Sequence, residues 1–304
     1  MLTVSRGSIC FWEGACMWVI NSSVEDGSTL ADIRFHAHHA VQVTRAIGGQ
    51  FQLQTSTQAI SGNVVAVAAD APHTISGHGL VAFLYIEPEG RVGRAISKRW
   101  LPANDLVSIV DPGLDPLRAH LAEAFSNPTG RHEKIRMIGR ALVGLLGEGR
   151  DEFVEATDPR VAKLISWASC HLEEGVSLTS APRLIGLSAA RARHLFVEQT
   201  ALAFRTYVLW LRLMRALELF SAGSTLTDAA HRAGFSDSAH LSRTFRRMFG
   251  IAAASMQTAS VNSTHDGDGD ERINSDEIGG FRCRGSRAAE FRSFRLRMQR
   301  LIVR

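Results

Sequence analysis

The chain has 304 residues, of which 45% are hydrophobic and 21% are charged, a balance typical of a globular protein with room for two domains. Its four cysteines form no CxxC pair, so we expect neither a disulfide framework nor a zinc finger, and a reducing compartment is favoured. No apolar run reaches the roughly 20 residues of a membrane span, and the N-terminus lacks the pattern of a signal peptide. We therefore expect a cytoplasmic protein with no membrane partner.

The charge of the chain is small overall but unevenly distributed. The net charge of +4 divides into −4 over residues 1–158, +6 over residues 159–257 and +2 over residues 258–304. A basic block behind an acidic one is typical of a segment that faces a polyanion, although an ordinary fluctuation of surface charge gives the same pattern.

Residues 1–113 have the pattern of a β domain. Residues 41–44 and 51–54 alternate apolar and polar side chains, and Gly48-Gly49 between them indicates a hairpin. Further short apolar runs follow at 64–69 and 80–86. Many short strands with frequent turns favour a sandwich or a small barrel.

Residues 114–158 change to the helical period. Two amphipathic helices are predicted there, one through Leu117 and Leu121 and one through Ile135 and Leu142, followed by a polar, acidic linker. These helices are suited to covering the sheet, to pairing with a second subunit, or to both.

Residues 159–257 are predicted to be entirely helical. A first helix covers 161–172, and a helix-turn-helix unit follows over 178–199, with Ser188 placed to cap its second helix. A long apolar helix over 204–220 then leads to a second unit, 226–249, in which Ser236, after the turn at Gly234, is placed to cap the second helix. Two short helices joined through a glycine, with the second helix basic, are the sequence pattern of a DNA-binding helix-turn-helix.

The paired units resemble the AraC/XylS family of bacterial transcription regulators. The residues that carry the resemblance are Ala229-Ala230, Gly234-Phe235-Ser236, Arg243-Thr244-Phe245 and Phe249-Gly250 in the second unit, and Leu187-Ser188 with Leu195-Phe196 in the first. The resemblance implies an α+β chain with a cupin-like N-terminal β-barrel, amphipathic linker helices, and a C-terminal all-α domain in which a long helix joins the two units.

Three positions depart from the family pattern. Pro182 stands where the first unit usually has alanine, and Ala201 replaces the glycine before the long helix. Ala252-Ala253 replaces the prolines that usually follow Phe-Gly. These departures affect the packing of the first unit and the end of the domain.

Base reading needs side chains near the start of each recognition helix that point away from the core. Arg243 is the best candidate for a bidentate contact with guanine, and Arg191, Arg246 and Arg247 suit phosphate, although any one of them could be an ordinary solvated charge. The candidate DNA-binding residues are Ala190, Arg191, Arg193, His194, Ser238, Ala239, His240, Ser242, Arg243, Arg246 and Arg247.

The N-terminal domain carries His36-Ala37-His38 and, further along, His73, which resemble the motif pair of cupins. In metal-binding cupins a glutamate stands four residues after the second histidine, but here that position is Gln42, a poor ligand. We therefore expect no metal and no cofactor, and assign His36, His38, Gln42 and His73 to a pocket for an unidentified effector. A purely structural role for these side chains is the alternative.

The tail, residues 258–304, is polar, then acidic, then basic, and is predicted to be partly disordered. Residues 266–277 place acids in the register of a calcium loop, but Glu271 occupies the position of the turn glycine, so an acidic linker is the better interpretation. Beyond it, a basic amphipathic stretch could touch DNA or lipid, or be an unselected extension.

The main functional hypothesis is a sequence-specific, effector-responsive transcription regulator that is not an enzyme. The resemblance implies promoter DNA and a second copy of the chain as partners, with RNA polymerase as a further candidate. It leaves open whether the protein activates or represses. The competing hypothesis is a cupin-type metal enzyme fused to a DNA-binding module. A cysteine-based alkylation sensor is disfavoured because Cys10 and Cys16 lack neighbouring ligand cysteines.

Overall fold

The computed structural model describes residues 6–22, 33–147, 157–173, 175–179 and 185–253, all within one compact unit that runs from Met1 to Asp270. The tail 258–304 with its calcium-like stretch, most of the acidic linker, and Pro182 lie outside these residues. None of the helices in the described ranges combines the length and the hydropathy that a membrane span requires.

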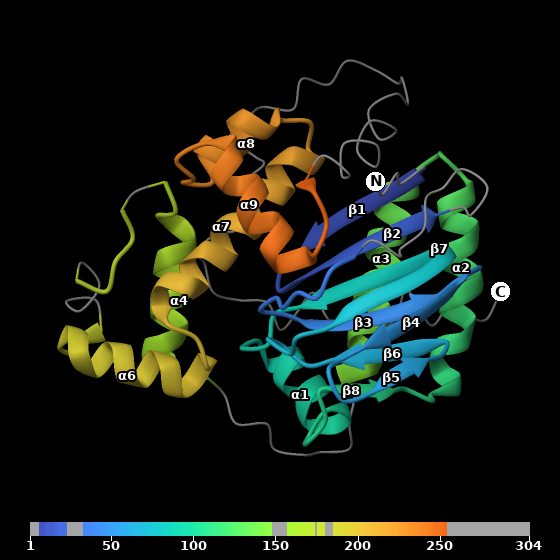
Figure 1. Cartoon of the computed structure of the whole chain (residues 1–304), viewed down its shortest axis with the longest axis horizontal. Coiled ribbons are helices and arrows are strands. Elements are labelled where there is room, and N and C mark those ends of the chain that lie inside the picture. Colours follow the sequence, from blue (N-terminus) through green and yellow to red (C-terminus); the bar gives the residue numbers. More distant parts are fainter. Residues whose placement is uncertain (1–5, 23–32, 148–156, 174, 180–184, 254–304) are drawn as a thin grey trace, which may run out of the picture. The chain divides into compact units, whose positions relative to one another are not determined.

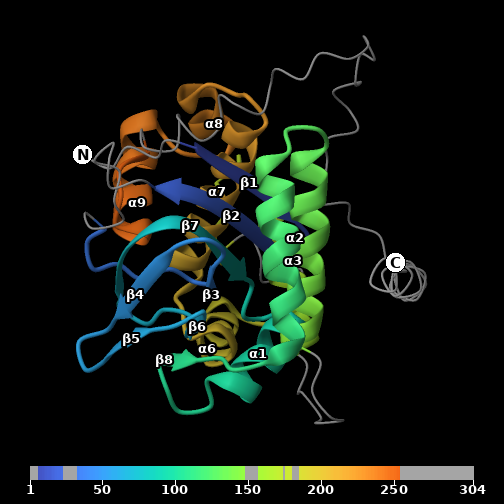
Figure 2. The same ribbon diagram turned by 90° about the vertical axis from the view of Figure 1, so that its right-hand side faces the viewer.

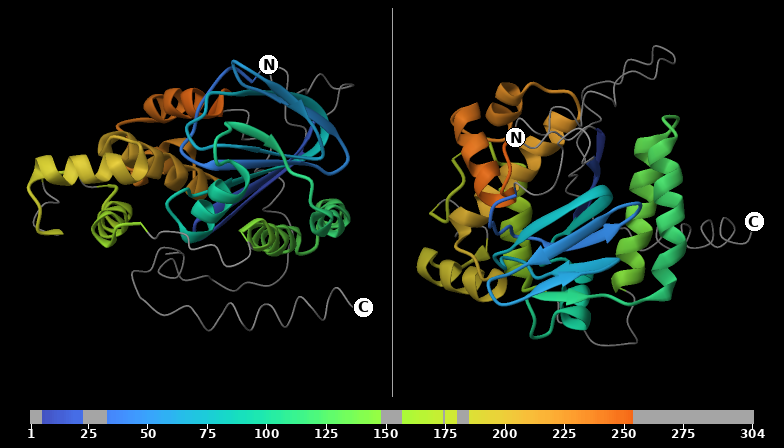
Figure 3. Two further views of the ribbon diagram at one scale, coloured as in Figure 1. Left: turned by 90° about the horizontal axis from the view of Figure 1, so that it is seen from below. Right: turned by 45° about the vertical axis from the view of Figure 1, so that its right-hand side comes forward.

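The N-terminal part is an antiparallel sheet built around one long strand, β7 (Figure 1). The strands follow the order β1-β2-β7-β3-β6-β8, and β4 pairs with β7 and β5. No pairing between described residues joins β1 to β8, so the sheet is strongly curled but open (Figure 3). The strands are β1 Arg6–Trp12, β2 Ala15–Ser22, β3 Val41–Ala46, β4 Gln50–Gln54, β5 Ala59–Ser61, β6 Val64–Val67, β7 Thr74–Ile86 and β8 Leu106–Ser108.

Gly48-Gly49 is not the turn of a hairpin, contrary to the sequence prediction. Strands β3 and β4 run one after the other along β7, with Ala46 opposite Val81 and Gln50 opposite His78. The two glycines form the bend between them, where a Cβ on Gly49 would lie 2.2 Å from the carbonyl oxygen of His78. The bend therefore needs glycine for close backbone approach, not for chain reversal.

One face of the sheet is covered by helices α1 (Arg91–Trp100), α2 (Asp115–Ser126) and α3 (Arg131–Gly147) (Figure 2). Leu121 and Ile135 are fully buried there in one apolar cluster with sheet residues such as Met17. The two predicted amphipathic helices are thus present as α2 and α3 and cover the sheet. The short helix α1 and strand β8 were not predicted.

The opposite face of the sheet shares its core with the second helix-turn-helix unit. The indole of Trp18 on β2 lies parallel to Phe245, 6.3 Å between centroids, and 4.8 Å from the ring of Phe249. The C-terminal helices are α4 Pro159–Cys170, α6 Ala189–Thr200, α7 Phe204–Ser221, α8 Leu226–Arg232 and α9 Ser238–Phe249. The α+β class and the C-terminal all-α domain are therefore as expected.

The first helix-turn-helix unit has an apolar core of its own. Helices α4 and α6 meet the N-terminal half of α7 around Leu164, Phe196 and Tyr207, each of them fully buried. Helix α7, with 18 residues, contributes to this core at one end and to the core shared with the sheet at the other. It is the structural link between the two units, as the sequence predicts.

The starts of the recognition helices follow from local capping. Ser188 Oγ accepts the backbone N–H of Arg191 at 3.3 Å, which confirms the predicted cap of α6. At α9 the cap is Asp237 instead of Ser236: its Oδ1 accepts the N–H of His240 at 2.6 Å, and Ser236 Oγ donates to the carboxylate. A carboxylate satisfies the free N–H groups of a helix start better than a hydroxyl one residue earlier in the chain.

Candidate nucleic-acid interface and the adjoining pocket

The second helix-turn-helix unit depends on a glycine at its turn. Gly234 has φ +81, and a Cβ at this position would lie 2.1 Å from the carbonyl oxygen of Leu172. Arg212 of α7 donates to the same carbonyl from Nε and Nη2, at 3.2 and 3.0 Å. The turn is thus fitted against the end of the first helix of the domain and directs α9 away from α8.

Helix α9 has a buried side and a basic, solvent-facing side. Leu241, Phe245 and Phe249 are buried, as predicted. Of the predicted DNA-binding residues on this helix, Ala239, Arg243, Arg246 and Arg247 are exposed, and Ser238, His240 and Ser242 are half-buried. Such a helix can present cations and small polar groups to a groove of DNA while its apolar side holds it to the protein.

Helix α6 repeats this division in the first unit. Ala192 and Phe196 are buried in the core, whereas the predicted contact residues Ala190, Arg191, Arg193 and His194 are all exposed. The two recognition helices therefore both carry arginines on their free sides.

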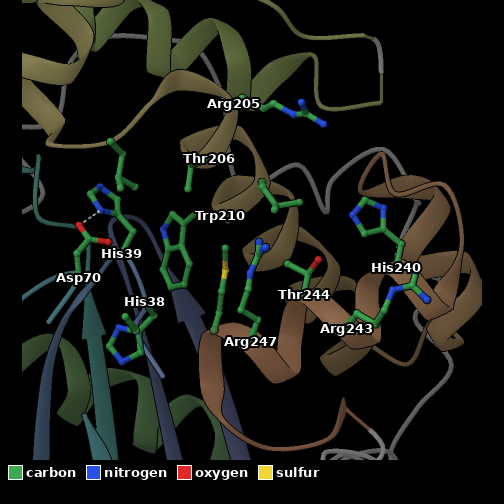
Figure 4. A pocket seen from close by; sticks show the side chains of 14 residues that line it. His38, His39, Asp70, Arg205, Thr206, Trp210, His240, Arg243, Thr244 and Arg247 are labelled. Atoms are coloured by element: carbon green, nitrogen blue, oxygen red, sulfur yellow. Dashed lines mark hydrogen bonds and ion pairs between the residues drawn. The ribbon is translucent and has the colours of Figure 1, made fainter. Parts of the chain in front are cut away.

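A pocket of about 770 Å³ opens between helix α9, helix α7 and the loops that flank β3 and precede β7 (Figure 4). Two kinds of residue meet in it that belong to different predicted sites: His38 from the effector set, and His240, Arg243 and Arg247 from the DNA set. Its lining is formed by Ala37, His38, His39, Asp70, Leu202, Arg205, Thr206, Leu209, Trp210, His240, Arg243, Thr244, Arg247 and Met248.

The predicted effector residues form a buried cluster at one side of this pocket. Ring nitrogens of His36, His38 and His73 all lie within 4.8 Å of one another. Gln42 Oε1 accepts the Nε2–H of His38 at 2.9 Å and lies 3.3 Å from His73 Nε2. The structure thus brings together all four residues that the sequence pattern singled out.

Hydrogen bonds to the backbone orient two of these rings. The Nδ1–H groups of His36 and His73 donate to the carbonyls of Arg34 and Ala71, each at 2.8 Å, so their Nε2 atoms carry the lone pairs. Three neutral imidazoles could in principle hold a metal ion, with Gln42 in the place of an acidic ligand.

The cluster is uncharged at neutral pH. Burial, together with the neighbouring His73, lowers the pKa of His36 to about 4, and burial lowers the pKa of His73 as well. Burial and the two neighbouring imidazoles push the pKa of His38 well below its usual value. His38 Nδ1 is buried and has no hydrogen-bond partner among the described residues.

His39, next to the cluster, has the opposite electrostatic environment. Burial disfavours its charged form, but hydrogen bonds to Asp70 and Glu89, both at 2.7 Å, outweigh that effect and raise its pKa to about 9. His39, Asp70 and Glu89 were not predicted as site residues, because their hydrogen bonds join segments far apart in the chain.

Two half-buried glutamates connect the sheet to helix α7. The Tyr207 hydroxyl donates to Glu87 Oε1 and Glu89 Oε2, both at 3.2 Å. Burial, and next the charge of Glu89, raise the pKa of Glu87, whereas the hydrogen bond from Tyr207 lowers it. This polar contact lies where the first unit, the long helix and the sheet meet.

The sequence of the C-terminal domain matches known proteins. A helix-turn-helix domain family matches residues 183–259. The HTH-type transcriptional activator RhaS of Enterobacter sp. (strain 638) is 34% identical over 99 residues, which cover 32% of this chain and 36% of that activator, and RhaS of Escherichia coli (strain SE11) matches to the same extent. The match thus spans about a third of the length of these relatives.

Two solved structures share the fold over most of the chain. Apo ToxT from Vibrio cholerae strain SCE256, in a variant form, has a TM-score of 0.53 and 9% identity, and covers 81% of this chain and 98% of its own. ToxT from Vibrio cholerae O395 has a TM-score of 0.51 and 12% identity, with 83% and 98% covered. The common fold is an N-terminal β-sheet domain followed by a helical helix-turn-helix domain. The match of a helix-turn-helix domain over residues 183–259 and the two likenesses of fold thus agree with the resemblance of the paired units to the AraC/XylS family.

Proposed function

We propose that the protein is a sequence-specific, DNA-binding transcription regulator whose N-terminal domain responds to a small-molecule effector. The observation that carries the proposal is the pair of recognition helices, α6 and α9, joined by α7 and each presenting exposed arginines. The helix-turn-helix domain, whose relatives are transcriptional activators, also supports DNA binding.

Under this proposal the contacts divide into base reading and backbone positioning. Arg243 is the candidate for bidentate recognition of guanine, with Ser238, Ala239, His240 and Ser242 beside it on α9. On α6 the candidates are Ala190, Arg193 and His194, and the residues proposed to touch phosphate are Arg191, Arg246 and Arg247.

The test begins with a genome-wide binding map of the full chain in its host, which identifies a motif if the proposal is right. A duplex carrying that motif is then titrated with purified wild-type, Arg243→Ala, Arg246→Ala and Arg140→Ala proteins. Loss of a bidentate guanine contact should cost about 1–3 kcal/mol of discrimination at one base pair, so Arg243→Ala should relax specificity.

The other variants separate the two kinds of contact. Arg246→Ala should weaken binding to all sequences and reduce the slope of log K against log salt by about 0.9, the value for one phosphate contact. Arg140 is exposed on α3, and Arg140→Ala removes the same charge at a site outside both recognition helices. This variant therefore serves as the control. Absence of discrete peaks, together with DNA affinity that does not depend on salt, would refute the proposed function.

The proposal also includes the direction of regulation, the protein partners and the location. Because the matched relatives are transcriptional activators, we infer activation, with RNA polymerase as the protein partner. We further propose a homodimer and a cytoplasmic location. The enzyme alternative finds support only in the histidine cluster, and the regulator relatives do not favour it.

A further inference from the structure

We propose that the pocket between α9, α7 and the sheet binds an organic anion with an apolar body, and that this ligand opposes DNA binding by occupying arginines of the recognition helix. This inference rests on the proposed function and adds to it a location, a chemical class of ligand and a direction of regulation. It differs from the effector site predicted from sequence, which consisted of the histidine cluster alone.

Positive charge predominates in the lining of the pocket. Arg205, Arg243 and Arg247 line it, and within the described residues none of the three forms a salt bridge. The one acidic residue of the lining, Asp70, is bonded to His39 at 2.7 Å. Arg243 has the carboxylate of Asp237 nearby, so Arg205 and Arg247 are the guanidinium groups of the lining without an acidic partner among the described residues. They favour an anion, and carboxylate, sulfonate or phosphate groups match their planar donor sets.

Much of the remaining wall of the pocket is apolar. Leu202, Leu209 and Trp210 from the loop and helix on one side, and Met248 from α9 on the other, line the pocket between the cations. A volume of about 770 Å³ lies in the range of sites for organic ligands, which combine apolar walls with a few polar groups. An inorganic ion would leave that wall uncovered.

The direction of regulation follows from shared residues. Figure 4 shows Arg247 rising from α9 beside Trp210, and Arg243 and His240 on the same helix toward the other side. Arg243 and Arg247 are also the side chains proposed to contact a base and a phosphate. One guanidinium cannot bind an anionic ligand and DNA at once, so each should weaken the other by the same factor.

The first experiment tests the pocket without DNA. The full chain is titrated with 8-anilinonaphthalene-1-sulfonate and with N-phenyl-1-naphthylamine, which has the same ring system and no sulfonate. We expect the sulfonate to bind at least about tenfold more tightly, which corresponds to about 1.4 kcal/mol. Arg247→Gln should remove this preference, Arg247→Lys should restore part of it, and the surface control Arg140→Gln should keep it.

The inference is overturned if Arg247→Gln and Arg140→Gln bind the sulfonate alike, or if both probes bind the wild type equally. Circular dichroism of each variant shows whether it is folded. Arg205→Gln changes the pocket at helix α7. If this variant also loses the sulfonate preference, the loss seen with Arg247→Gln does not come from a local effect on α9.

The second experiment adds a duplex that carries the motif from the binding map. The sulfonate should raise the apparent Kd for the duplex in proportion to its occupancy, whereas the uncharged probe should not. If the chain binds the duplex and the sulfonate binds without competing, this inference fails and the proposed function stands. If the sulfonate binds the pocket but no duplex is recognised, the proposed function is what fails.

Discussion

Replacing Tyr207 with phenylalanine tests the buried polar contact between helix α7 and the sheet. The change removes one hydroxyl, which donates to Glu87 Oε1 and Glu89 Oε2 at 3.2 Å each, and leaves the ring in place. Tyr207 itself is fully buried.

The expected magnitude follows from the charge of the acceptors. A hydrogen bond to a charged group contributes about 1.5–3 kcal/mol, and one shared hydroxyl hydrogen counts once, so the free energy of unfolding should fall by about 2 kcal/mol at pH 7. The hydroxyl also lowers the pKa of Glu87, which burial raises. Its removal should therefore raise that pKa further.

The loss should depend on pH, with a definite sign. An acid whose pKa is raised in the folded state stabilises the fold below its unfolded pKa, and this contribution disappears as the pH rises through the folded pKa. The variant loses more free energy of unfolding over that pH range than the wild type, because the pKa of Glu87 is higher in the variant. The penalty of Tyr207→Phe should thus be larger at pH 7 than at pH 5.

Urea denaturation at pH 5, 6 and 7, followed by tryptophan fluorescence and by circular dichroism, measures the penalty. Tyr85→Phe is the matched control, since Tyr85 is the only other tyrosine, is also buried, and its hydroxyl forms no hydrogen bond among the described residues. In a Glu87→Gln background the penalty should shrink. A penalty equal to that of Tyr85→Phe and independent of pH would refute the reasoning.

Two further changes test single features. Ala201 has φ +57 in the left-handed region at the end of α6, so Ala201→Gly should stabilise the protein by about 0.5–1 kcal/mol in thermal or chemical denaturation. Ala222→Gly, at the end of α7 with φ −82, should not stabilise it, and equal effects would contradict the backbone argument. Because the pKa of His36 is lowered to about 4, its contribution to stability is lost as the pH falls below 6.5, by about 1.4 kcal/mol per pH unit. Between pH 6.5 and 5 the wild type should therefore lose about 2 kcal/mol more than His36→Asn, and parallel pH curves for the two proteins would show that His36 is not buried in its neutral form.

Predictions from the sequence were most accurate for features that depend on a few neighbouring residues. Ser188 caps α6 as expected, and Leu241 and Phe245 define the buried side of α9, because capping and helical periodicity act over a few residues. Ala201 was singled out as a departure from glycine, and it adopts the left-handed conformation for which glycine is usual.

Features that join distant segments could not be predicted. Gly48-Gly49 was taken for a hairpin because its true partner strand, β7, lies some thirty residues further along the chain. The pocket combines His38 with Arg243 and Arg247 from the other end of the chain, and no periodicity records that contact. His39 was passed over for the same reason, since Asp70 and Glu89 give it its charge.

Helix α7 links two separate apolar cores. One end is packed in the core that the second unit shares with the sheet, and the other end carries the first unit on its separate core. Eighteen residues at about 1.5 Å each make a rod of roughly 27 Å. A tilt of about 10° at the sheet would therefore displace α6 by roughly 5 Å, close to one turn of a helix and enough to change the alignment of two recognition helices on one duplex.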